Sequence, residues 1–370
     1  MKIGIDARFW SQTGVGRYTK NLVIELSKLD KKNEYVLFAN EKDIPDISSK
    51  INNDRWSIVK CNIKWHSLSE QFLFSKVLNS NSLDLVHFPY FSHPIFYNKS
   101  FVVTIHDLII NHFPTGKAST QPMSLYVLKW LGYRKVLSHA VKKSKKIIVP
   151  LKFVKNDLSR TLEVPQNKIE VTPEGFDPAI SKGKISNKAI YQILDTKYFL
   201  YVGNAYPHKN LEKLIEGFYK SKADANLILV GKDDYFYKRL EKEKFRNLIF
   251  LHDVTDSELF HLYSNSIAAV SASLMEGFGL LPLEAFGCGT IPVVSNIPAF
   301  GEVCHDSAIY FNPQDADDIA KKLNFVLKLP AKERENLIKK GKAILSRFSW
   351  EKMAKETLRI YESCSSPSSK

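Results

Sequence analysis

The chain has 370 residues, of which 44% are hydrophobic and 25% are charged, and its formal net charge is +14. This composition excludes an extensively disordered chain, and the length favours two domains over one. The four cysteines (Cys61, Cys288, Cys304 and Cys364) lack the spacing of zinc ligands, which indicates a reducing compartment and argues against a disulfide framework.

The first half alternates strand-like and helix-like segments, as parallel α/β domains do. Apolar runs predict strands at 2–7, 35–39, 57–61, 83–88, 101–105, 146–149 and 168–171. A loop with Gly14 and Gly16 follows the first strand and precedes a helix. It resembles a dinucleotide-binding fingerprint, but Thr19 replaces the third glycine and no acidic residue ends the second strand. The loop therefore disfavours NAD and favours a backbone that phosphate or substrate can approach.

Two polar groups in this half are candidate ligands. Glu70 and Gln71, after Trp65, either line an acceptor pocket or lie on a helix surface. His106 ends the strand 101–105, where it either bonds a sugar hydroxyl or carbonyl, or is a structural histidine held by Asp107 or the backbone.

The positive charge predicts an anionic partner. The cluster Lys142-Lys143-Ser144-Lys145-Lys146 follows an amphipathic stretch at 125–133, and forms either a membrane-surface patch or a helix end whose lysines complement the helix dipole. No nucleic-acid module accompanies it, so nucleic acid is not an expected partner. With no signal peptide or bilayer-spanning segment, we expect a cytoplasmic protein, soluble or peripheral on the inner face of the cell membrane.

The second half repeats the same pattern after a connection of mixed composition. Strands are predicted at 198–202, 226–230, 248–251, 268–271, 291–294 and 308–311, and a final helix begins at Trp350. We therefore expect an acceptor domain at 1–176, a linker at 177–197, a nucleotide-sugar domain at 198–345, and a helix at 346–370 that crosses back and ends in a disordered tail. The fold class is α/β, with two Rossmann-like doubly wound domains facing a central cleft.

The segment from Gly203 and Asn204 to Lys209 and Asn210 directly follows the strand 198–202 and precedes an amphipathic helix. Lys209 is thus placed at a helix start, where free backbone N–H groups and an ammonium together can neutralise a diphosphate. An exposed lysine in a strand–helix loop is the structural alternative.

The stretch Glu276-Gly277-Phe278-Gly279-Leu280-Leu281-Pro282-Leu283-Glu284 constrains function most tightly. Pro282 suits the first position of a helix, which would place Glu284 in its first turn. Gly277 and Gly279 let the backbone approach a ligand, amides at a helix start attract anions, and carboxylates accept hydrogen bonds from hydroxyls. A nucleotide sugar offers both phosphate and hydroxyl groups. The alternatives are a helix-start carboxylate and a solvated glutamate.

No metal site is expected. Asp315-Ala316-Asp317 has the form of a metal-binding Asp-x-Asp motif, but it lies at a helix start after Asn312-Pro313, where acidic residues serve as caps. Phosphate neutralisation would then come from Lys209, other cations and helix termini.

Taken together, these residues resemble the retaining glycosyltransferases of family 4, which have the GT-B fold. The resemblance covers nearly the whole chain and is carried by the following segments: Gly14-Val15-Gly16, Thr104-Ile105-His106-Asp107, Thr172-Pro173-Glu174-Gly175-Phe176-Asp177, Glu276 and Glu284 with seven residues between them, and Ser349-Trp350-Glu351. His208 departs from the family, in which many relatives carry arginine, and Asn204 stands near a position that is often basic.

The resemblance implies catalytic roles for Glu276, Lys209 and His106. Glu276 and the backbone of Gly277, Phe278, Gly279 and Leu280 would hold the donor sugar and phosphates, Glu284 the ribose, Lys209 the diphosphate, and backbone near Val254 the base. Gly14, Gly16, Gly203, Asn204 and Asn210 complete the expected donor-binding set.

The sequence thus predicts a metal-independent, retaining hexosyltransferase without cofactor. It would use a GDP- or UDP-linked sugar, with GDP-mannose favoured, and a saccharide or lipid-linked saccharide acceptor in cell-surface polysaccharide synthesis. Three alternatives remain: a glycoside hydrolase using Glu276 and Glu284 as its acid/base pair, an NAD-dependent double-Rossmann oxidoreductase, and a non-enzymatic basic protein.

Overall fold

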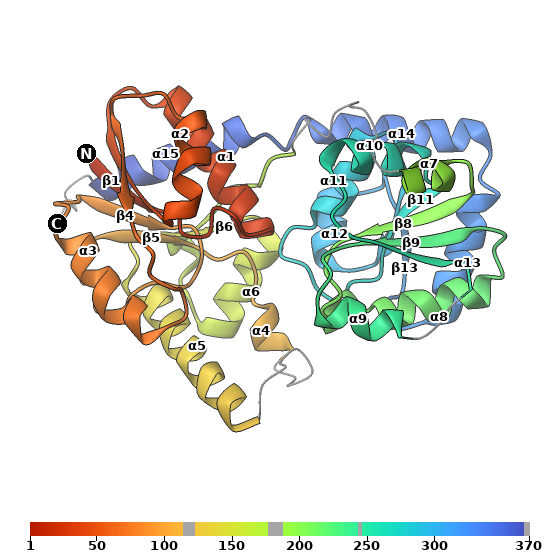
Figure 1. Cartoon of the computed structure of the whole chain (residues 1–370), viewed down its shortest axis with the longest axis horizontal. Helices are drawn as coiled ribbons and strands as arrows, with labels where there is room; N and C mark the ends of the chain where they lie inside the picture. Colours follow the sequence, from red (N-terminus) through yellow and green to blue (C-terminus); the bar gives the residue numbers. More distant parts are fainter. Residues whose placement is uncertain (114–122, 177–187, 243–245, 366–370) are drawn as a thin grey trace. The chain divides into compact units, whose positions relative to one another are not determined.

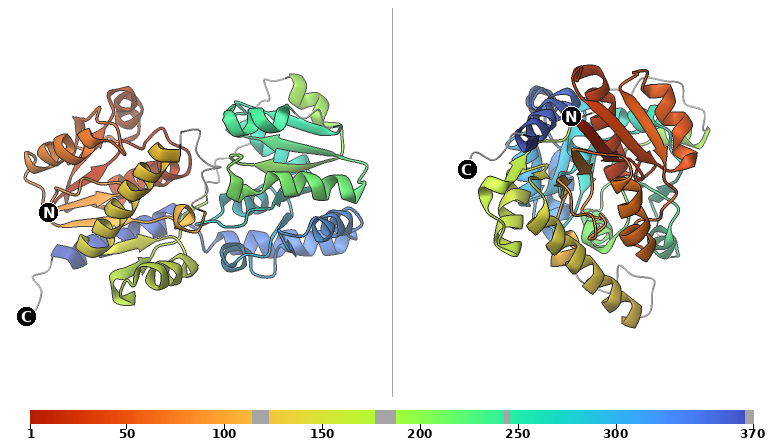
Figure 2. Two further views of the ribbon diagram at one scale, coloured as in Figure 1. Left: turned by 90° about the horizontal axis from the view of Figure 1, so that it is seen from below. Right: turned by 90° about the vertical axis from the view of Figure 1, so that its left-hand side faces the viewer.

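The computed structural model describes residues 1–113, 123–176, 188–242 and 246–365. It contains two compact units, one formed by residues 1–108, 119–175 and 349–370 (unit 1) and one by residues 109–118 and 176–348 (unit 2). Each unit has one parallel sheet covered by helices (Figure 1), as two further views show (Figure 2). The predicted α/β class with two doubly wound sheets is confirmed.

The sheet of unit 1 has seven strands in the order β3-β2-β1-β4-β5-β6-β7. The strands are β1 (Lys2–Asp6), β2 (Glu34–Ala39), β3 (Trp56–Lys60), β4 (Leu85–Phe88), β5 (Phe101–Thr104), β6 (Ile147–Val149) and β7 (Ile169–Val171). Ile3 of β1 pairs with Tyr35 on one side and with Leu85 on the other. Helices cover both faces of such a sheet, which explains why its central strands are continuous apolar runs.

The helices of unit 1 mostly cross from the end of one strand to the start of the next. They are α1 (Gly14–Leu29), α2 (Ile44–Lys50), α3 (Ser75–Asn79), α5 (Met123–Lys143), α6 (Lys152–Leu162) and α15 (Trp350–Ser365), with the short turns η1 (Glu41–Asp43), η2 (Glu70–Phe74) and η4 (Gln166–Lys168). Because α1 begins at Gly14, the glycines lie in its first turn, and the prediction that they precede the helix is wrong. A Cβ at Gly16 would lie 2.7 Å from the carbonyl oxygens of Phe9 and Trp10, so this turn requires glycine there.

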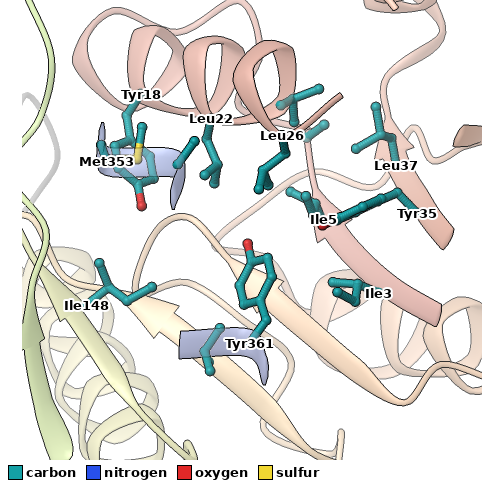
Figure 3. Close-up of a cluster of buried hydrophobic side chains, with 14 of the residues drawn as sticks. Ile3, Ile5, Tyr18, Leu22, Leu26, Tyr35, Leu37, Ile148, Met353 and Tyr361 are labelled. Atoms are coloured by element: carbon teal, nitrogen blue, oxygen red, sulfur yellow. The ribbon is translucent and has the colours of Figure 1, made fainter. Parts of the chain in front are cut away.

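Helix α15 completes the core of unit 1 although it lies at the far end of the chain. It packs against α1, and Met353 and Tyr361 are fully buried with Leu22 of α1 and Ile5 of β1 (Figure 3). The Tyr361 hydroxyl lies 2.6 Å from Nδ1 of His87 in β4, whose Nε2 lies 2.8 Å from the hydroxyl of Thr104 in β5. The last helix is therefore bound to the sheet by both apolar contacts and hydrogen bonds.

The sheet of unit 2 has six strands in the order β10-β9-β8-β11-β12-β13. The strands are β8 (Tyr198–Val202), β9 (Asn226–Val230), β10 (Leu248–Leu251), β11 (Ala268–Ser271), β12 (Pro292–Ser295) and β13 (Ile309–Phe311). The strand order reverses between β8 and β11, since β9 and β10 are added on one side of β8 and β12 and β13 are added beyond β11 on the other. In doubly wound sheets this switch point, at the carboxyl ends of the strands, is where ligands bind.

The helices of unit 2 include one in the segment predicted as a linker. They are α4 (Ile109–His112), α7 (Lys188–Leu194), α8 (Leu211–Ser221), α9 (Tyr235–Glu241), α10 (Asp256–Asn265), α11 (Leu280–Gly287), α12 (Pro298–Cys304), α13 (Ala316–Leu327) and α14 (Ala331–Leu345), with the short turn η5 (Pro207–Lys209). The rest of the predicted linker at 177–187 and the predicted tail from 366 onward lie outside the described residues. None of the helices described is both long enough and apolar enough to cross a bilayer.

The packing of α15 predicts a specific loss of stability. Met353→Ala removes a fully buried side chain from the core of unit 1, and we expect the free energy of unfolding to fall by about 2–5 kcal/mol. Urea denaturation followed by circular dichroism measures this change. The neighbouring Lys352 is exposed, so Lys352→Ala should stay within about 0.5 kcal/mol of wild type. Equal effects of the two substitutions would contradict the packing.

Candidate functional site

The loops after β8 and β11 meet at the switch point of unit 2. The amide of Leu274, after β11, donates a hydrogen bond of 2.8 Å to the carbonyl of His208 in η5. Asn210 has a left-handed backbone (φ 58°), and its side-chain amide donates to the carbonyls of Ala272 and Pro313, at 3.1 and 2.8 Å. The amide of this predicted donor-binding residue thus joins the two loops.

Lys209 and Glu276 form an ion pair where these loops meet. Nζ of Lys209 donates to Oε1 of Glu276 at 2.7 Å and to Oε2 at 2.8 Å, and the Ser273 hydroxyl donates to Oε1 at 2.7 Å. The two side chains are only 16% and 12% exposed. Residues 67 positions apart are thus brought into direct contact.

The ion pair keeps Glu276 ionised. Burial raises the pKa of its carboxyl, but the charge and hydrogen bonds of Lys209, together with the Ser273 hydroxyl, outweigh burial and lower the pKa below its usual range. The carboxylate is therefore an acceptor of hydrogen bonds at neutral pH. A general acid needs a raised pKa, so this environment is unlike that of the acid in a glycosidase pair.

His208 lies beside this pair as a neutral group. Burial, followed by the charge of Lys209, lowers the pKa of its imidazole to about 4. The site therefore holds one cation fewer at neutral pH than it would with an arginine at this position.

The glycine turn after Glu276 leads directly into α11. Gly279 precedes the helix with φ of 88°, and a Cβ there would lie 2.6 Å from the Phe300 ring. Because α11 begins at Leu280, Pro282 is its third residue, and the prediction that it is the first is wrong. Proline is tolerated there because the first four N–H groups of a helix have no intrahelical partner.

Glu284 lies past the first turn of α11, contrary to the prediction, and is 7% exposed. Its Oε2 accepts a hydrogen bond of 2.8 Å from the Tyr263 hydroxyl of α10. Tyr263 thus orients one oxygen of this carboxylate.

The remaining residues predicted to bind the donor follow two strands of unit 2. Gly203 and Asn204 come directly after β8, and the Asn204 carbonyl accepts a hydrogen bond of 2.6 Å from the Tyr201 hydroxyl. Val254 follows β10, the edge strand, and directly precedes Thr255, which caps α10. These loops all lie at the carboxyl edge of the sheet.

His106 lies in unit 1, after β5, and both of its ring nitrogens have partners. Nε2 is 2.9 Å from the carbonyl oxygen of Pro89, and Nδ1 is 2.9 Å from Oε1 of Glu174. Both partners accept hydrogen bonds, so the geometry suits an imidazolium that donates twice. Burial lowers the pKa of His106, but Glu174, the Pro89 carbonyl and Asp107 raise it more, and the net shift is upward. The side chain of His106 is thus held by a backbone carbonyl, as the structural alternative in the sequence analysis expected. Its second partner, Glu174, was not indicated by the sequence.

Glu70 does not line a surface. It is fully buried, and its carboxylate accepts hydrogen bonds from Arg8 (2.7 Å), Ser92 (2.8 Å) and the amide of His66 (3.0 Å). Arg8 also pairs with Asp6 at 2.7 Å. The carboxylate of Glu70 is thus held by partners within unit 1, and the predicted role of Glu70 in binding an acceptor stays a prediction.

Gln71 holds a loop of its own unit. Its Oε1 accepts a hydrogen bond from the amide of Ile95 at 2.8 Å, and its Nε2 donates to the carbonyl of His93 at 3.4 Å. Its amide therefore fixes the segment that follows β4.

Asp315 caps a helix. Its Oδ1 accepts hydrogen bonds from the amides of Asp317 and Asp318, at 2.9 and 3.3 Å, which is the capping role that the sequence favoured. In the part of the chain that the structure describes, one group of three residues, namely Asp233, Glu241 and His252, brings its ligand atoms within 4.8 Å of one another. His252 and Glu241 already share a hydrogen bond of 2.7 Å, and Asp233 pairs with Lys238 at 3.2 Å.

Comparison with protein families accounts for most of the chain. A family model described as "Glycosyltransferase Family 4" matches residues 12–180, and one described as "Glycosyl transferases group 1" matches residues 184–344.

Two curated relatives are bacterial. An O-antigen chain mannosyltransferase of Salmonella typhimurium (strain LT2) is 28% identical and covers 72% of this chain and 71% of its own length. O-antigen chain mannosyltransferase B of Escherichia coli is 26% identical, covering 95% of this chain and 96% of its own.

Solved structures share the fold. Sucrose-phosphate synthase from Thermosynechococcus elongatus has a TM-score of 0.76 at 18% identity, covering 98% of both chains. The Anabaena protein HepE, solved with UDP-glucose, has a TM-score of 0.74 at 16% identity, covering 98% of this chain and all of its own.

The raised pKa of His106 predicts a pH-dependent contribution to stability. An unfolded histidine has a pKa of about 6.5, so the charged pair with Glu174 stabilises fully below that pH and is lost as the pH rises through the higher folded-state value. We expect the difference in free energy of unfolding between wild type and His106→Gln to be largest near about pH 5 and to shrink toward about pH 9. Urea titrations across this range measure it, and a constant difference would contradict the charged pair.

Proposed function

Since the chain belongs to the retaining glycosyltransferases of family 4, which have the GT-B fold, we propose that it transfers a hexose from a nucleotide sugar to a hydroxyl of a saccharide or lipid-linked saccharide. The observation that carries the proposal is the ion pair of Lys209 and Glu276 at the switch point of unit 2. A cation for phosphate and an ionised acceptor for hydroxyls stand side by side there.

In this proposal Lys209 neutralises the departing diphosphate. A lysine ammonium carries three protons, and two of them are donated to Glu276, so the third is directed to a phosphate oxygen. The amides from Gly277 to Leu280, where α11 begins, provide further donors. Such groups stabilise the charge that develops as the bond between sugar and phosphate breaks.

Glu276 and Glu284 are proposed to hold two parts of the donor. The lowered pKa of Glu276 supports a role as acceptor from sugar hydroxyls. Glu284, oriented by Tyr263, would accept from the ribose, and the backbone at Val254 would meet the base. Gly203 and Asn204 would border the phosphates.

The chemical step would place the acceptor oxygen on the same face of the sugar that the phosphate leaves. The acceptor oxygen bonds to the anomeric carbon, the bond from that carbon to the phosphate oxygen breaks, and the acceptor proton passes to the departing phosphate. In unit 1, Gly14 and His106 would border the sugar and the acceptor. A direct bond from His106 would require release of Glu174 or Pro89, so we assign His106 a positioning role.

We propose mannose as the sugar and GDP as the carrier, in the synthesis of a cell-surface polysaccharide. Both bacterial relatives described above are mannosyltransferases of O-antigen chains. A UDP-sugar is the alternative donor, because a neighbour in fold was solved with UDP-glucose. We further propose that no metal or cofactor takes part, with Lys209 and backbone amides serving the diphosphate, and that the enzyme works in the cytoplasm at the inner face of the cell membrane.

Substitution of the ion pair tests the site. We expect Lys209→Ala and Glu276→Gln each to lower the rate of sugar transfer by at least ~100-fold, because each removes a positioned electrostatic group. Glu276→Gln keeps the shape of the side chain, and thermal unfolding would verify that both variants fold. Lys213→Ala is the matched control, since Lys213 lies half-buried on α8, with 34% of its side chain exposed, and pairs with the exposed Glu216. Near-wild-type rates of sugar transfer by both site variants would contradict the assignment of Lys209 and Glu276 to the donor site.

A donor screen tests the sugar, the base and metal independence together. We expect GDP-mannose to raise the melting temperature more than UDP-glucose or ADP-glucose does, since a ligand that binds only the folded state stabilises it. Transfer from the preferred donor should be unchanged in EDTA. A requirement for a divalent cation would show that Lys209 and the amides do not suffice, and a larger shift with UDP-glucose would favour the alternative donor.

A further inference from the structure

The positive charge of the chain is concentrated in one segment. Residues 61–156 contain thirteen lysines and arginines but only three acidic residues, in a chain whose net charge is +14. Of those three, Glu70 is buried in the pair with Arg8, and Asp84 accepts a hydrogen bond from the Lys2 amide at the amino edge of the sheet. Helix α5 contains five basic residues and no acidic one.

Large apolar side chains are exposed in the same segment. Those of unit 1 fall in two groups, one at and just before η2 and in the loop after β4, and the other in the first half of α5. The first group is Leu68, Phe72, Leu73 and Phe96, and the second is Val127, Leu128 and Leu131. Leu68 is 79% exposed and Leu128 is 66% exposed. Exposed apolar groups that gather in one region mark an interaction surface.

Contacts through the loop after β4 join the two groups. Phe72 of η2 stacks on Phe96 of this loop at 4.8 Å between ring centroids. Phe91 of the same loop meets the Tyr133 ring of α5 edge-on at 4.9 Å. We call η2, the loop at 89–98 and residues 127–135 of α5 the basic apolar face.

The topology places this face at the carboxyl edge of the sheet. The η2 turn follows β3, the loop at 89–98 follows β4, and α5 lies on the crossover from β5 to β6. All strands are parallel, so these segments leave from the edge at which Gly14 and His106 lie. The first half of α5 lies nearer that edge, and this end of the helix projects from the body of unit 1 (Figure 1, Figure 2).

The cluster at Lys142–Lys146 lies at the other edge. It spans the end of α5 and the start of β6, and Lys146 is paired with Glu170 at 2.7 Å. Lys142 and Lys143 lie in the last turn of α5, where lysines complement the helix dipole. The structure thus separates these lysines from the exposed leucines, although both belong to one helix.

We propose that the basic apolar face binds an anionic phospholipid surface and holds the carboxyl edge of unit 1 against it. Leu128 and Leu131 enter the boundary between headgroups and acyl chains, while Lys129, Arg134 and Lys135 meet lipid phosphates. This inference rests on the proposed function. It specifies that the acceptor is amphiphilic, with a lipid that stays in the membrane and a sugar that reaches the site. Nucleic acid would use the cations but not the leucines.

Vesicle sedimentation tests the proposal without any nucleotide sugar, so its result is independent of the assigned activity. The probes are phosphatidylethanolamine vesicles containing phosphatidylglycerol, and vesicles of phosphatidylcholine alone. We expect binding to the former that weakens with salt, and at least ~10-fold weaker binding to the latter. Equal binding to both, or none to either, would overturn the proposal.

Two pairs of substitutions with the same change in charge locate the surface. Lys129→Glu with Lys135→Glu should weaken binding to the anionic vesicles by at least ~10-fold, and by more than Lys142→Glu with Lys143→Glu. All four lysines are exposed, so neither pair should disturb folding. An equal or larger loss from the second pair would assign binding to the other edge of the sheet and overturn the proposal.

The apolar part has its own control. Leu128→Glu with Leu131→Glu should abolish measurable vesicle binding but leave the thermal shift with donor unchanged, whereas Phe325→Glu, at a 51% exposed site on α13 of unit 2, should leave vesicle binding intact. Light scattering without lipid tests whether a second copy of the chain binds the basic apolar face in place of a membrane. A dimer that Leu128→Glu dissociates would contradict the proposal.

Discussion

Parallel strands in a sheet all end at the same edge, and this constraint organises both units. The chain returns from most strands through a helix, so the loops that follow the strands converge at the carboxyl edge. In unit 2 the loops after β8 and β11 supply Lys209 and Glu276 from either side of the switch point. In unit 1 the same edge carries the first turn of α1 and His106. In the loops of the candidate site, Asn210, Asp253 and Gly279 have left-handed backbones.

The Lys209–Glu276 pair lies in a position where neither charge is well hydrated. Taking an ammonium and a carboxylate out of water costs several kcal/mol per ion, which mutual attraction and the Ser273 hydrogen bond offset. Lys209 lowers the pKa of the Glu276 carboxyl and so keeps it ionised. In the proposed function, a diphosphate would provide Lys209 with a second anion, while sugar hydroxyls would provide Glu276 with further donors. The pair would thus be arranged in advance for the proposed ligand, which is negative at one end and rich in hydroxyls at the other.

The sequence was sufficient for the strands and for placing Lys209 and Glu276 in loops that follow strands, because both depend on local patterns. All thirteen predicted strands have counterparts within two residues, since buried parallel strands are continuous apolar runs. Helix starts were less accurate. Gly14 and Leu280 begin helices earlier than expected, because glycine in a first turn is tolerated when the backbone packs closely and proline suits more than one early position.

Side-chain partners distant in the sequence could not be predicted. Glu70 is matched to Arg8, 62 residues away, and His106 to Glu174, 68 residues away, and no local pattern marks either pair. Ser273 could have been predicted as a partner of Glu276, because it lies three residues earlier and a hydroxyl at that spacing can reach the carboxylate. The exposed leucines of α5 were visible in the sequence, but their separation from the lysines at 142–146 required the direction of the helix relative to the sheet.

The return of α15 to unit 1 determines the order in which the chain can be completed during synthesis. Unit 2 is almost continuous in sequence, so it can close its core once residue 348 has left the ribosome. Unit 1 cannot complete its core at that point, because Tyr361, which packs beside His87 and shares a hydrogen bond with it, lies 274 residues later in the chain. The earlier-made sheet is therefore the later to be finished, and its open core remains exposed to chaperones and proteases while unit 2 is being translated.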